Sequence, residues 1–158
     1  MKKLKIPDSI KWESSQSGWI LDDLEATIKF GEALSKNLAH VKILLLEGPL
    51  GAGKTSLIKG IGKGLGINEP ITSPSFGLAH HYLNSKRTLF HLDLYRLEQP
   101  AAANEFFYEE EEEANDLKAL MVIEWPSRLS INLHEALYIK LKYLDSGGRL
   151  IQVNSKEY

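Results

Sequence analysis

The spacing of apolar residues along the first half of the chain predicts a helix, a strand and a second helix. Near-helical spacing predicts a helix over residues 21–39, where Asp22 and Asp23 can cap the free N–H groups of the first turn. Residues 41–47 are rich in leucine and β-branched residues, which is typical of a strand buried on both faces. A glycine-rich loop follows, and the next helix is expected from residue 54 to about residue 65. The chain therefore places a strand–loop–helix unit near its start.

The second half of the chain predicts two hairpins, another helix and another buried strand. These are a hairpin of residues 76–83 and 87–92, a helix over residues 100–113, a strand over residues 119–124, and a hairpin of residues 138–144 and 149–153. Strands that alternate with helices favour an α/β fold, because each helix returns the chain to the start of a parallel neighbour. We therefore expect a mixed parallel and antiparallel sheet flanked by helices.

Length and composition narrow the function classes. A chain of 158 residues suits a single domain, 1–158, in which residues 1–20 show no clear period and are expected to form an extended arm. The absence of cysteine excludes a disulfide framework, a cysteine zinc site and a thiol nucleophile. A net charge of −2 gives no general attraction to DNA, RNA or anionic lipid. No apolar run approaches the about 20 residues that a membrane helix needs, so we expect a soluble, cytoplasmic protein with no membrane contact.

The strongest chemical signal is the glycine-rich loop. Residues 48–55 read GPLGAGKT and match the P-loop pattern G-x-x-x-x-G-K-[ST]. Glycines let successive backbone N–H groups point at a phosphate, and the N-terminus of the following helix adds partial positive charge. An ordinary glycine turn would not require lysine and threonine directly after the last glycine. The pattern predicts a P-loop NTPase-like domain that binds a nucleoside triphosphate and Mg²⁺ through Leu50, Gly51, Ala52, Gly53, Lys54, Thr55 and Ser56.

Two carboxylates stand where they could act on a bound phosphate. Asp93 and Glu124 each end an apolar strand, and ligands of open α/β sheets bind at the carboxyl ends of the strands. Both would face the loop if their strands run parallel to the strand before it, although either could equally cap a nearby turn. Phosphoryl transfer needs acidic groups near the metal and the attacking water. We therefore take Asp93, Glu124 and Lys54 as candidate catalytic residues, and Thr55, Glu124 and Asp93 as candidate metal ligands.

Three other features have a structural interpretation beside the functional one. His91 could bond a phosphate or a partner, but a structural role is favoured. Arg96 and Arg128 could stabilise a transition state, although packing is favoured for both. The acidic run 109–113 is typical of a solvated helix face and could also meet a basic partner.

Four segments in order give the chain its resemblance to a known family. Besides the loop, residues 72–76 read TSPSF, residues 91–96 read HLDLYR, and residues 123–126 read IEWP. The chain resembles the TsaE (YjeE) family over about residues 21–153, with an S-P-T-F-like switch segment, an H-x-D-x-Y-R motif and an I-E-W-P motif. The last two motifs in this order are specific, whereas many families share the loop.

The resemblance implies ATP and Mg²⁺ binding, with slow hydrolysis that depends on partner proteins. The implied partners are TsaD, which transfers the threonylcarbamoyl group, and TsaB, and tRNA would be reached indirectly through their complex. By position, Lys54 would hold phosphates, Thr55 would ligate Mg²⁺, and Asp93 and Glu124 would support the metal and the water. The resemblance further suggests that the nucleotide is contacted by Trp125, Ser127 and Arg149.

The sequence departs from the family pattern at three positions, and none of them removes a phosphate or metal ligand. Pro49 replaces a usual aspartate, Ser75 a usual threonine, and Ser127 a usual acidic or amide residue.

Two other functions stay open from the residues alone. One is a small-molecule kinase, which would need an acceptor pocket and usually a lid with arginines. The other is a nucleotide-dependent binding module in which catalysis is not essential.

Overall fold

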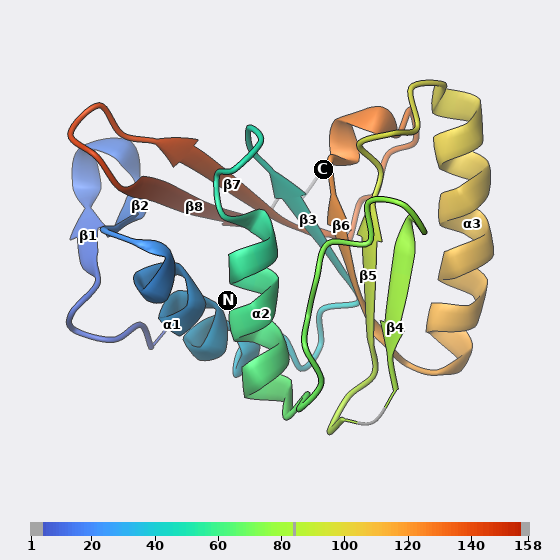
Figure 1. Ribbon diagram of the computed structural model, residues 1–158, viewed down its shortest axis with the longest axis horizontal. Coiled ribbons are helices and arrows are strands. Elements are labelled where there is room, and N and C mark those ends of the chain that lie inside the picture. The colour runs from blue at the N-terminus through green and yellow to red at the C-terminus, as the bar shows by residue number, and fades with distance from the viewer. Residues whose placement is uncertain (1–4, 84, 156–158) are drawn as a thin grey trace.

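One mixed sheet organises the part of the chain that the computed structural model describes, residues 5–83 and 85–155. Figure 1 shows three helices packed around it. The strands are β1 (Lys11–Glu13), β2 (Gly18–Leu21), β3 (Ile43–Glu47), β4 (Ala79–Tyr82), β5 (Leu89–Asp93), β6 (Leu120–Glu124), β7 (Leu137–Tyr143) and β8 (Arg149–Ser155). The helices are α1 (Leu24–Ser35), α2 (Lys54–Leu65) and α3 (Pro100–Asp116), with 3₁₀ turns η1 (Ser14–Gln16) and η2 (Pro126–Arg128). This is the single α/β domain that the alternating pattern predicts.

The four central strands are parallel, and this aligns their carboxyl ends along one edge. The strand order is β1-β2-β8-β7-β3-β6-β5-β4, and the pairs β7–β3, β3–β6 and β6–β5 are parallel. The pairs nearer each side of the sheet are antiparallel. In register, Glu124 of β6 lies opposite Leu46 of β3 and opposite Asp93 of β5. The strands that end in Asp93 and Glu124 thus run parallel to the strand before the loop, which is what the sequence analysis required for both carboxylates to face it.

Alternation along the strands divides the core between the two faces of the sheet. On β6, Leu120 and Val122 pack in the cluster that contains α1 and α2, whereas Met121 and Ile123 pack in the cluster that contains α3. By the same period of two, Glu124 faces the side of α2. Asp93 and Glu124, which end β5 and β6, therefore lie on the side of the sheet covered by α2, the helix that begins at the loop.

Helices α1 and α2 approach so closely that glycine is required between them. A Cβ built on Gly60 would lie 2.0 Å from the carbonyl oxygen of Ile28, and one on Gly31 would lie 2.3 Å from that of Leu57. Helix α2 ends at Leu65, as the sequence predicts, and Gly66 follows it at φ 79° with its N–H donating to the carbonyls of the last turn.

The expected extended arm over residues 1–20 is wrong for the described part of that segment. Residues 11–13 and 18–21 form the β1–β2 hairpin, and β2 pairs with β8, so the hairpin extends the main sheet. Residues 1–4 lie outside the described residues. The segment showed no clear period because its strands are short and its burial is uneven: Trp12 is largely exposed, yet its ring lies 4.6 Å from that of Trp19, centroid to centroid.

Other element boundaries differ from the sequence predictions by a few residues. Helix α1 begins at Leu24 because the side chain of Asp23 accepts the N–H of Ala26 at 2.7 Å, which makes Asp23 the N-cap. The first predicted hairpin forms as β4–β5, although Asn84 in its turn lies outside the described residues. The second forms as β7–β8.

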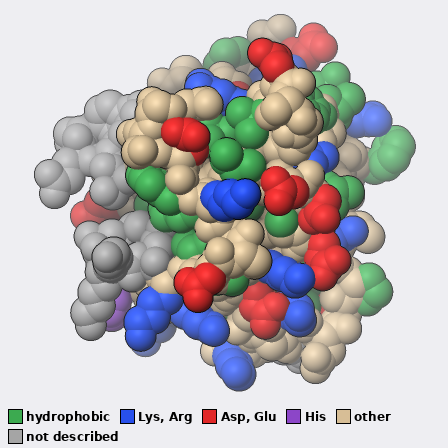
Figure 2. Space-filling model, turned by 90° about the vertical axis from the view of Figure 1, so that its left-hand side faces the viewer, with side chains coloured by type: hydrophobic (Ala, Val, Ile, Leu, Met, Phe, Trp, Pro, Cys, Tyr) green, Lys and Arg blue, Asp and Glu red, His purple; other side chains and the backbone are tan. Residues whose placement is uncertain are grey.

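The surface carries mixed charge. On the side that shows the β1–β2 hairpin and α1, Figure 2 shows acidic and basic side chains interspersed. Two close pairs contribute to this pattern, Lys29–Glu25 at 2.8 Å and Lys63–Glu32 at 2.9 Å. Within the described residues, none of the helices has the length and apolar character needed to cross a membrane.

Candidate active site

The loop between β3 and α2 is held in a defined shape by its own glycines and by the β7–β8 hairpin. Gly51 (φ 76°) and Gly53 (φ 102°) adopt left-handed conformations that favour glycine. Arg149 donates its Nε–H to the carbonyl oxygen of Ala52 at 2.9 Å, and the Tyr143 hydroxyl donates to that of Leu50 at 2.9 Å. The loop carbonyls are therefore hydrogen-bonded to side chains that lie about 95 positions later in the chain.

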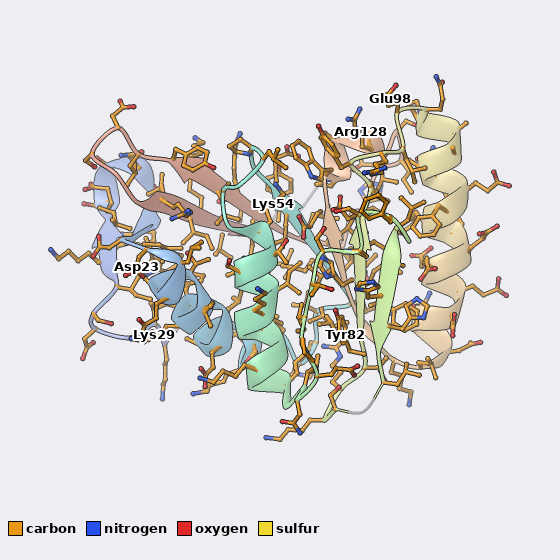
Figure 3. The ribbon with its side chains drawn as sticks, in the orientation of Figure 1. Asp23, Lys29, Lys54, Tyr82, Glu98 and Arg128 are labelled. Atoms are coloured by element: carbon orange, nitrogen blue, oxygen red, sulfur yellow. The ribbon has the colours of Figure 1, made fainter. Side chains whose placement is uncertain are left out.

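Lys54 occupies the inside of this loop. Figure 3 shows it at the end of α2 that faces the carboxyl edge of the central strands. Its ammonium donates to the carbonyl oxygens of Gly48 at 2.8 Å and Pro49 at 3.0 Å, and lies 4.3 Å from the centroid of the Trp125 ring. Burial lowers the pKa of Lys54 below its ordinary value, although the carboxylates of Glu124 and Asp93 oppose that shift.

A buried hydrogen-bonded row lies beside the lysine. The Thr55 hydroxyl donates to Oε1 of Glu124 at 3.1 Å, and Nε2 of His91 lies 2.9 Å from the same oxygen. Glu124 and His91 are both buried. The first turn of α2 is thus linked directly to the end of β6 and to the middle of β5.

Asp93 is held by a different set of groups. Ser73 donates its hydroxyl to Oδ2 of Asp93 at 2.8 Å, Ser75 lies at 3.4 Å from the same oxygen, and the two serine hydroxyls are 2.7 Å apart. The N–H of Tyr95 donates to Oδ1 at 3.1 Å. The segment that resembles a switch therefore contacts one of the two candidate catalytic carboxylates.

These groups surround one cleft of about 420 Å³ at the carboxyl edge of the sheet. The sequence-predicted residues that line it are Leu50, Gly51, Gly53, Lys54, Thr55, Ser56, Asp93, Glu124 and Trp125. Leu24, Ser73, Ser75 and Tyr95 line it as well. Neither Leu24 nor Tyr95 was among the site residues predicted from the sequence. The position of Tyr95 two residues after Asp93 in the HLDLYR segment was the available signal.

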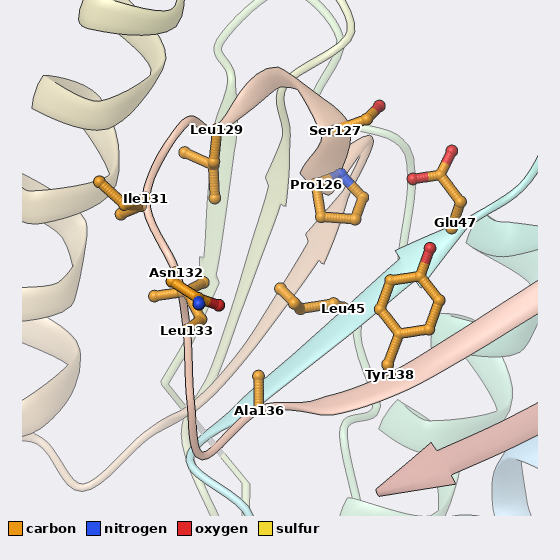
Figure 4. Close-up of a pocket in the computed structure, with 10 residues that line it drawn as sticks. All are labelled: Leu45, Glu47, Pro126, Ser127, Leu129, Ile131, Asn132, Leu133, Ala136 and Tyr138. Carbon is orange, nitrogen blue, oxygen red and sulfur yellow. The ribbon is translucent and has the colours of Figure 1, made fainter. Parts of the chain in front are cut away.

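The side chains of three other predicted nucleotide contacts do not line this cleft. That of Ala52, within the loop, is buried in the main core, and that of Arg149 donates to the loop backbone. Ser127 lines a separate pocket of about 220 Å³ together with Glu47 and Tyr138, which Figure 4 shows in close-up. The assignment of Ser127 as a nucleotide contact stays a prediction that its position does not favour.

The residues at the cleft fit a hard divalent cation better than a soft one. Thr55, Glu124 and Asp93 offer only oxygen donors, which Mg²⁺ prefers. Among the described residues, His, Cys, Asp and Glu form no cluster of three or more that could enclose a metal. An open site of this kind suits Mg²⁺, because that ion is commonly held by one or two carboxylates together with substrate phosphates and water.

The fold and the loop place the chain in the class of single α/β domains of the P-loop NTPase-like type. Residues 21–151 match the family model "Threonylcarbamoyl adenosine biosynthesis protein TsaE", and the chain belongs to the TsaE family. The resemblance seen in the four sequence segments is thereby confirmed.

Relatives named as tRNA threonylcarbamoyladenosine biosynthesis protein TsaE align over most of the chain. The protein of a Nostoc species is 40% identical over 136 residues, covering 84% of this chain and 82% of its own. That of Synechocystis is 43% identical over 113 residues, covering 70% and 71%. That of Treponema pallidum is 38% identical over 128 residues, covering 80% and 92%.

A solved structure has a similar fold. The crystal structure of YdiB from Bacillus subtilis superimposes with a TM-score of 0.64 at 25% sequence identity, covering 91% of this chain and 85% of that one. The two proteins therefore share an overall fold.

Proposed function

We propose that the chain binds ATP with Mg²⁺ in the loop cleft and hydrolyses it slowly, as a component of tRNA threonylcarbamoyladenosine biosynthesis. The observation that carries this proposal is the meeting of Lys54, Thr55, Asp93 and Glu124 at one cleft. Residues from the start of α2 and from the ends of two parallel strands supply a cation, a hydroxyl and two carboxylates. This set combines phosphate binding with groups that can orient a water molecule.

Each residue has a distinct part in the proposed reaction. Backbone N–H groups of the loop and the ammonium of Lys54 would bind the phosphates, for which Lys54 must exchange its contacts with Gly48 and Pro49. Thr55 and Glu124, with Asp93 nearby, would hold Mg²⁺, whose charge offsets that of the phosphates. Asp93, the second carboxylate, would then orient the attacking water.

The composition of the cleft supports slow turnover by the chain alone. Among the described residues that line the cleft, Lys54 is the only cation, and no arginine is present. An arginine that reaches the transferred phosphate accelerates hydrolysis about 10³–10⁵-fold in related reactions, and it can come from a partner. We therefore propose stimulation by TsaD and TsaB in the cytoplasm, with tRNA reached only through their complex.

The proposal is tested by measuring phosphate release from ATP and from GTP, with and without TsaB, TsaD and tRNA. We expect slow, Mg²⁺-dependent release by the chain alone and a clear increase when TsaB and TsaD are both added. Unchanged turnover in the presence of both proteins would contradict the proposed partnership. Transfer of phosphate to a metabolite in preference to water would instead support the small-molecule kinase.

Asp93→Asn and Glu124→Ala distinguish catalysis from binding alone. We expect each change to lower turnover by about 10²-fold or more while ATP still binds, because the loop backbone and Lys54 remain, although Thr55 loses its acceptor in Glu124→Ala. Glu47→Ala is the matched control, since Glu47 also ends a central strand but lines the separate pocket. If both variants lose hydrolysis yet fully support tRNA modification in cells, the chain acts as a binding module.

The lowered pKa of Lys54 predicts a pH dependence of ATP binding. The protonated ammonium attracts phosphate, whereas the neutral amine does not, so affinity is present below the pKa of Lys54 and is lost as pH rises through it. Because burial lowers that pKa from 10.5, the loss should begin at a lower pH than for an exposed lysine. Titration calorimetry with a non-hydrolysable ATP analogue from pH 7 upward measures this. Lys54→Arg should show no such decline over the same range, since arginine stays charged.

A further inference from the structure

His91 is fully buried in the middle of the sheet, and among the described residues its side chain hydrogen-bonds only to a candidate catalytic carboxylate. Its side chain is 0% exposed, and Nε2 lies 2.9 Å from Oε1 of Glu124. The same oxygen accepts the hydroxyl of Thr55 at 3.1 Å. Two donors from different elements, α2 and β5, therefore converge on one oxygen of the residue that ends β6.

The second ring nitrogen of His91, Nδ1, indicates where the ring hydrogen lies. Among the described residues, Nδ1 of His91 is the one buried side-chain nitrogen or oxygen without a hydrogen-bond partner. A hydrogen on Nε2 allows the ring to donate to Glu124 and leaves Nδ1 as an unpaired acceptor. A hydrogen on Nδ1 alone would leave that donor unpaired and set an acceptor against the carboxylate. The geometry thus favours a ring hydrogen on Nε2.

His91 supports the cleft from behind. It lies two residues before Asp93 on β5, so both face the side of α2, but His91 is not among the residues that line the cleft. A group in this position cannot contact the nucleotide, and its effect on chemistry must pass through Glu124.

We infer that His91 is a positioning residue that fixes the orientation of the Glu124 carboxylate for phosphate chemistry. This inference rests on the function proposed above. A strand-end carboxylate can rotate about its side-chain bonds, and a buried donor at one oxygen restricts that rotation. Hydrogen-bonded partners of this kind, placed behind metal- or substrate-binding groups, are commonly worth about 10–100-fold in activity or metal affinity.

A second histidine–glutamate pair, which joins the sheet to α3, provides the matched control. His81 on β4 lies 2.6 Å from Glu110 of α3 and stacks on Phe90, away from the cleft. Removing His81 also breaks a contact between a strand histidine and a carboxylate, but it leaves Glu124 untouched. A loss that follows only from His91 is therefore specific to the Glu124 contact.

The kinetic test compares His91→Leu, His91→Gln and His81→Leu for ATP turnover, each checked for folding by circular dichroism and thermal unfolding. We expect His91→Leu to lower kcat about 10–100-fold with little change in KM, because the loop contacts remain. His91→Gln should recover most of that loss, since its amide nitrogen reaches about as far as Nε2 and can donate. His81→Leu should keep the native kcat. A native kcat in folded His91→Leu would overturn the inference, as would His91→Gln being as slow as a folded His91→Leu.

A spectroscopic test does not depend on turnover. Ring ¹⁵N resonances of the native protein should show His91 with its hydrogen on Nε2, and these resonances should shift in Glu124→Ala. A hydrogen on Nδ1, or resonances unchanged by Glu124→Ala, would overturn the inference even if the leucine variant does not fold. Absence of turnover in the native protein with its partners would contradict the proposed function, whereas the spectrum still decides the contact.

Discussion

Replacing Lys54 with alanine is expected to lower ATP turnover by about 100-fold or more and to weaken ATP binding. The ammonium is buried inside the loop and is the only cation among the described residues that line the cleft, so no neighbour there can replace its charge. Its present acceptors are backbone carbonyls of Gly48 and Pro49, which the alanine variant leaves exposed to water in the open cleft. Phosphate release and calorimetric titration with ATP measure the two effects.

Lys59→Ala is the control for this change. Lys59 lies on the same helix and is exposed, so its loss removes one positive charge from α2 without touching the loop. We expect native turnover from that variant. Unchanged ATP affinity in Lys54→Ala would contradict the use of the loop as a phosphate site.

The second large effect concerns stability. In an open helix, replacing glycine with alanine gains about 1 kcal/mol, because alanine loses less backbone freedom on folding. At Gly60 the new Cβ would lie 2.0 Å from the carbonyl oxygen of Ile28, and overpacking of this kind costs about 3 kcal/mol. We therefore expect Gly60→Ala to lower the free energy of unfolding by about 2 kcal/mol in urea denaturation.

Gly62→Ala tests whether crowding against a side chain costs less stability than the crowding against backbone in Gly60→Ala. A Cβ there would meet Cδ1 of Ile71 at 2.1 Å, but this atom is the end of a side chain that can rotate away. We expect the free energy of unfolding of Gly62→Ala to stay within about 1 kcal/mol of the native value. Equal losses in the two variants would show that the close approach of α1 and α2 does not limit stability.

The elements that sequence reasoning placed best are those with a strong local signal. Helix α2 begins at Lys54 and ends at Leu65 as predicted, because the loop glycines fix its start and Gly66 provides its end. Strands β3 and β6 were recognised from apolar runs. β6 is buried throughout, whereas β3 is buried on one face only and Leu45 on the other face is half-buried. The β1–β2 hairpin was missed, since three- and four-residue strands with mixed exposure carry no readable period.

The contacts within the cleft likewise divide into those that a local sequence signal predicts and those that it does not. Lys54 and Thr55 follow from a contiguous motif, because their spacing along the chain already fixes their place at the start of a helix. The contacts of Ser73 with Asp93 and of His91 with Glu124 span 20 and 33 residues. No local pattern encodes a hydroxyl or imidazole that meets its partner only after strands pair. The place of Ser127 in the separate pocket was not foreseen for the same reason, since nearness to Trp125 in sequence does not determine which pocket a side chain lines.

By itself the sequence determined which residues are apolar enough to form buried strands, where the phosphate-type loop lies, and to which family the motifs point. Strand order, the shared direction of β3, β5 and β6, and the register that sets Asp93 opposite Glu124 were decided only by the tertiary structure. The physical reason is that burial and backbone preference act on each residue and its near neighbours. Strand pairing, by contrast, depends on how distant segments together bury two faces of one sheet.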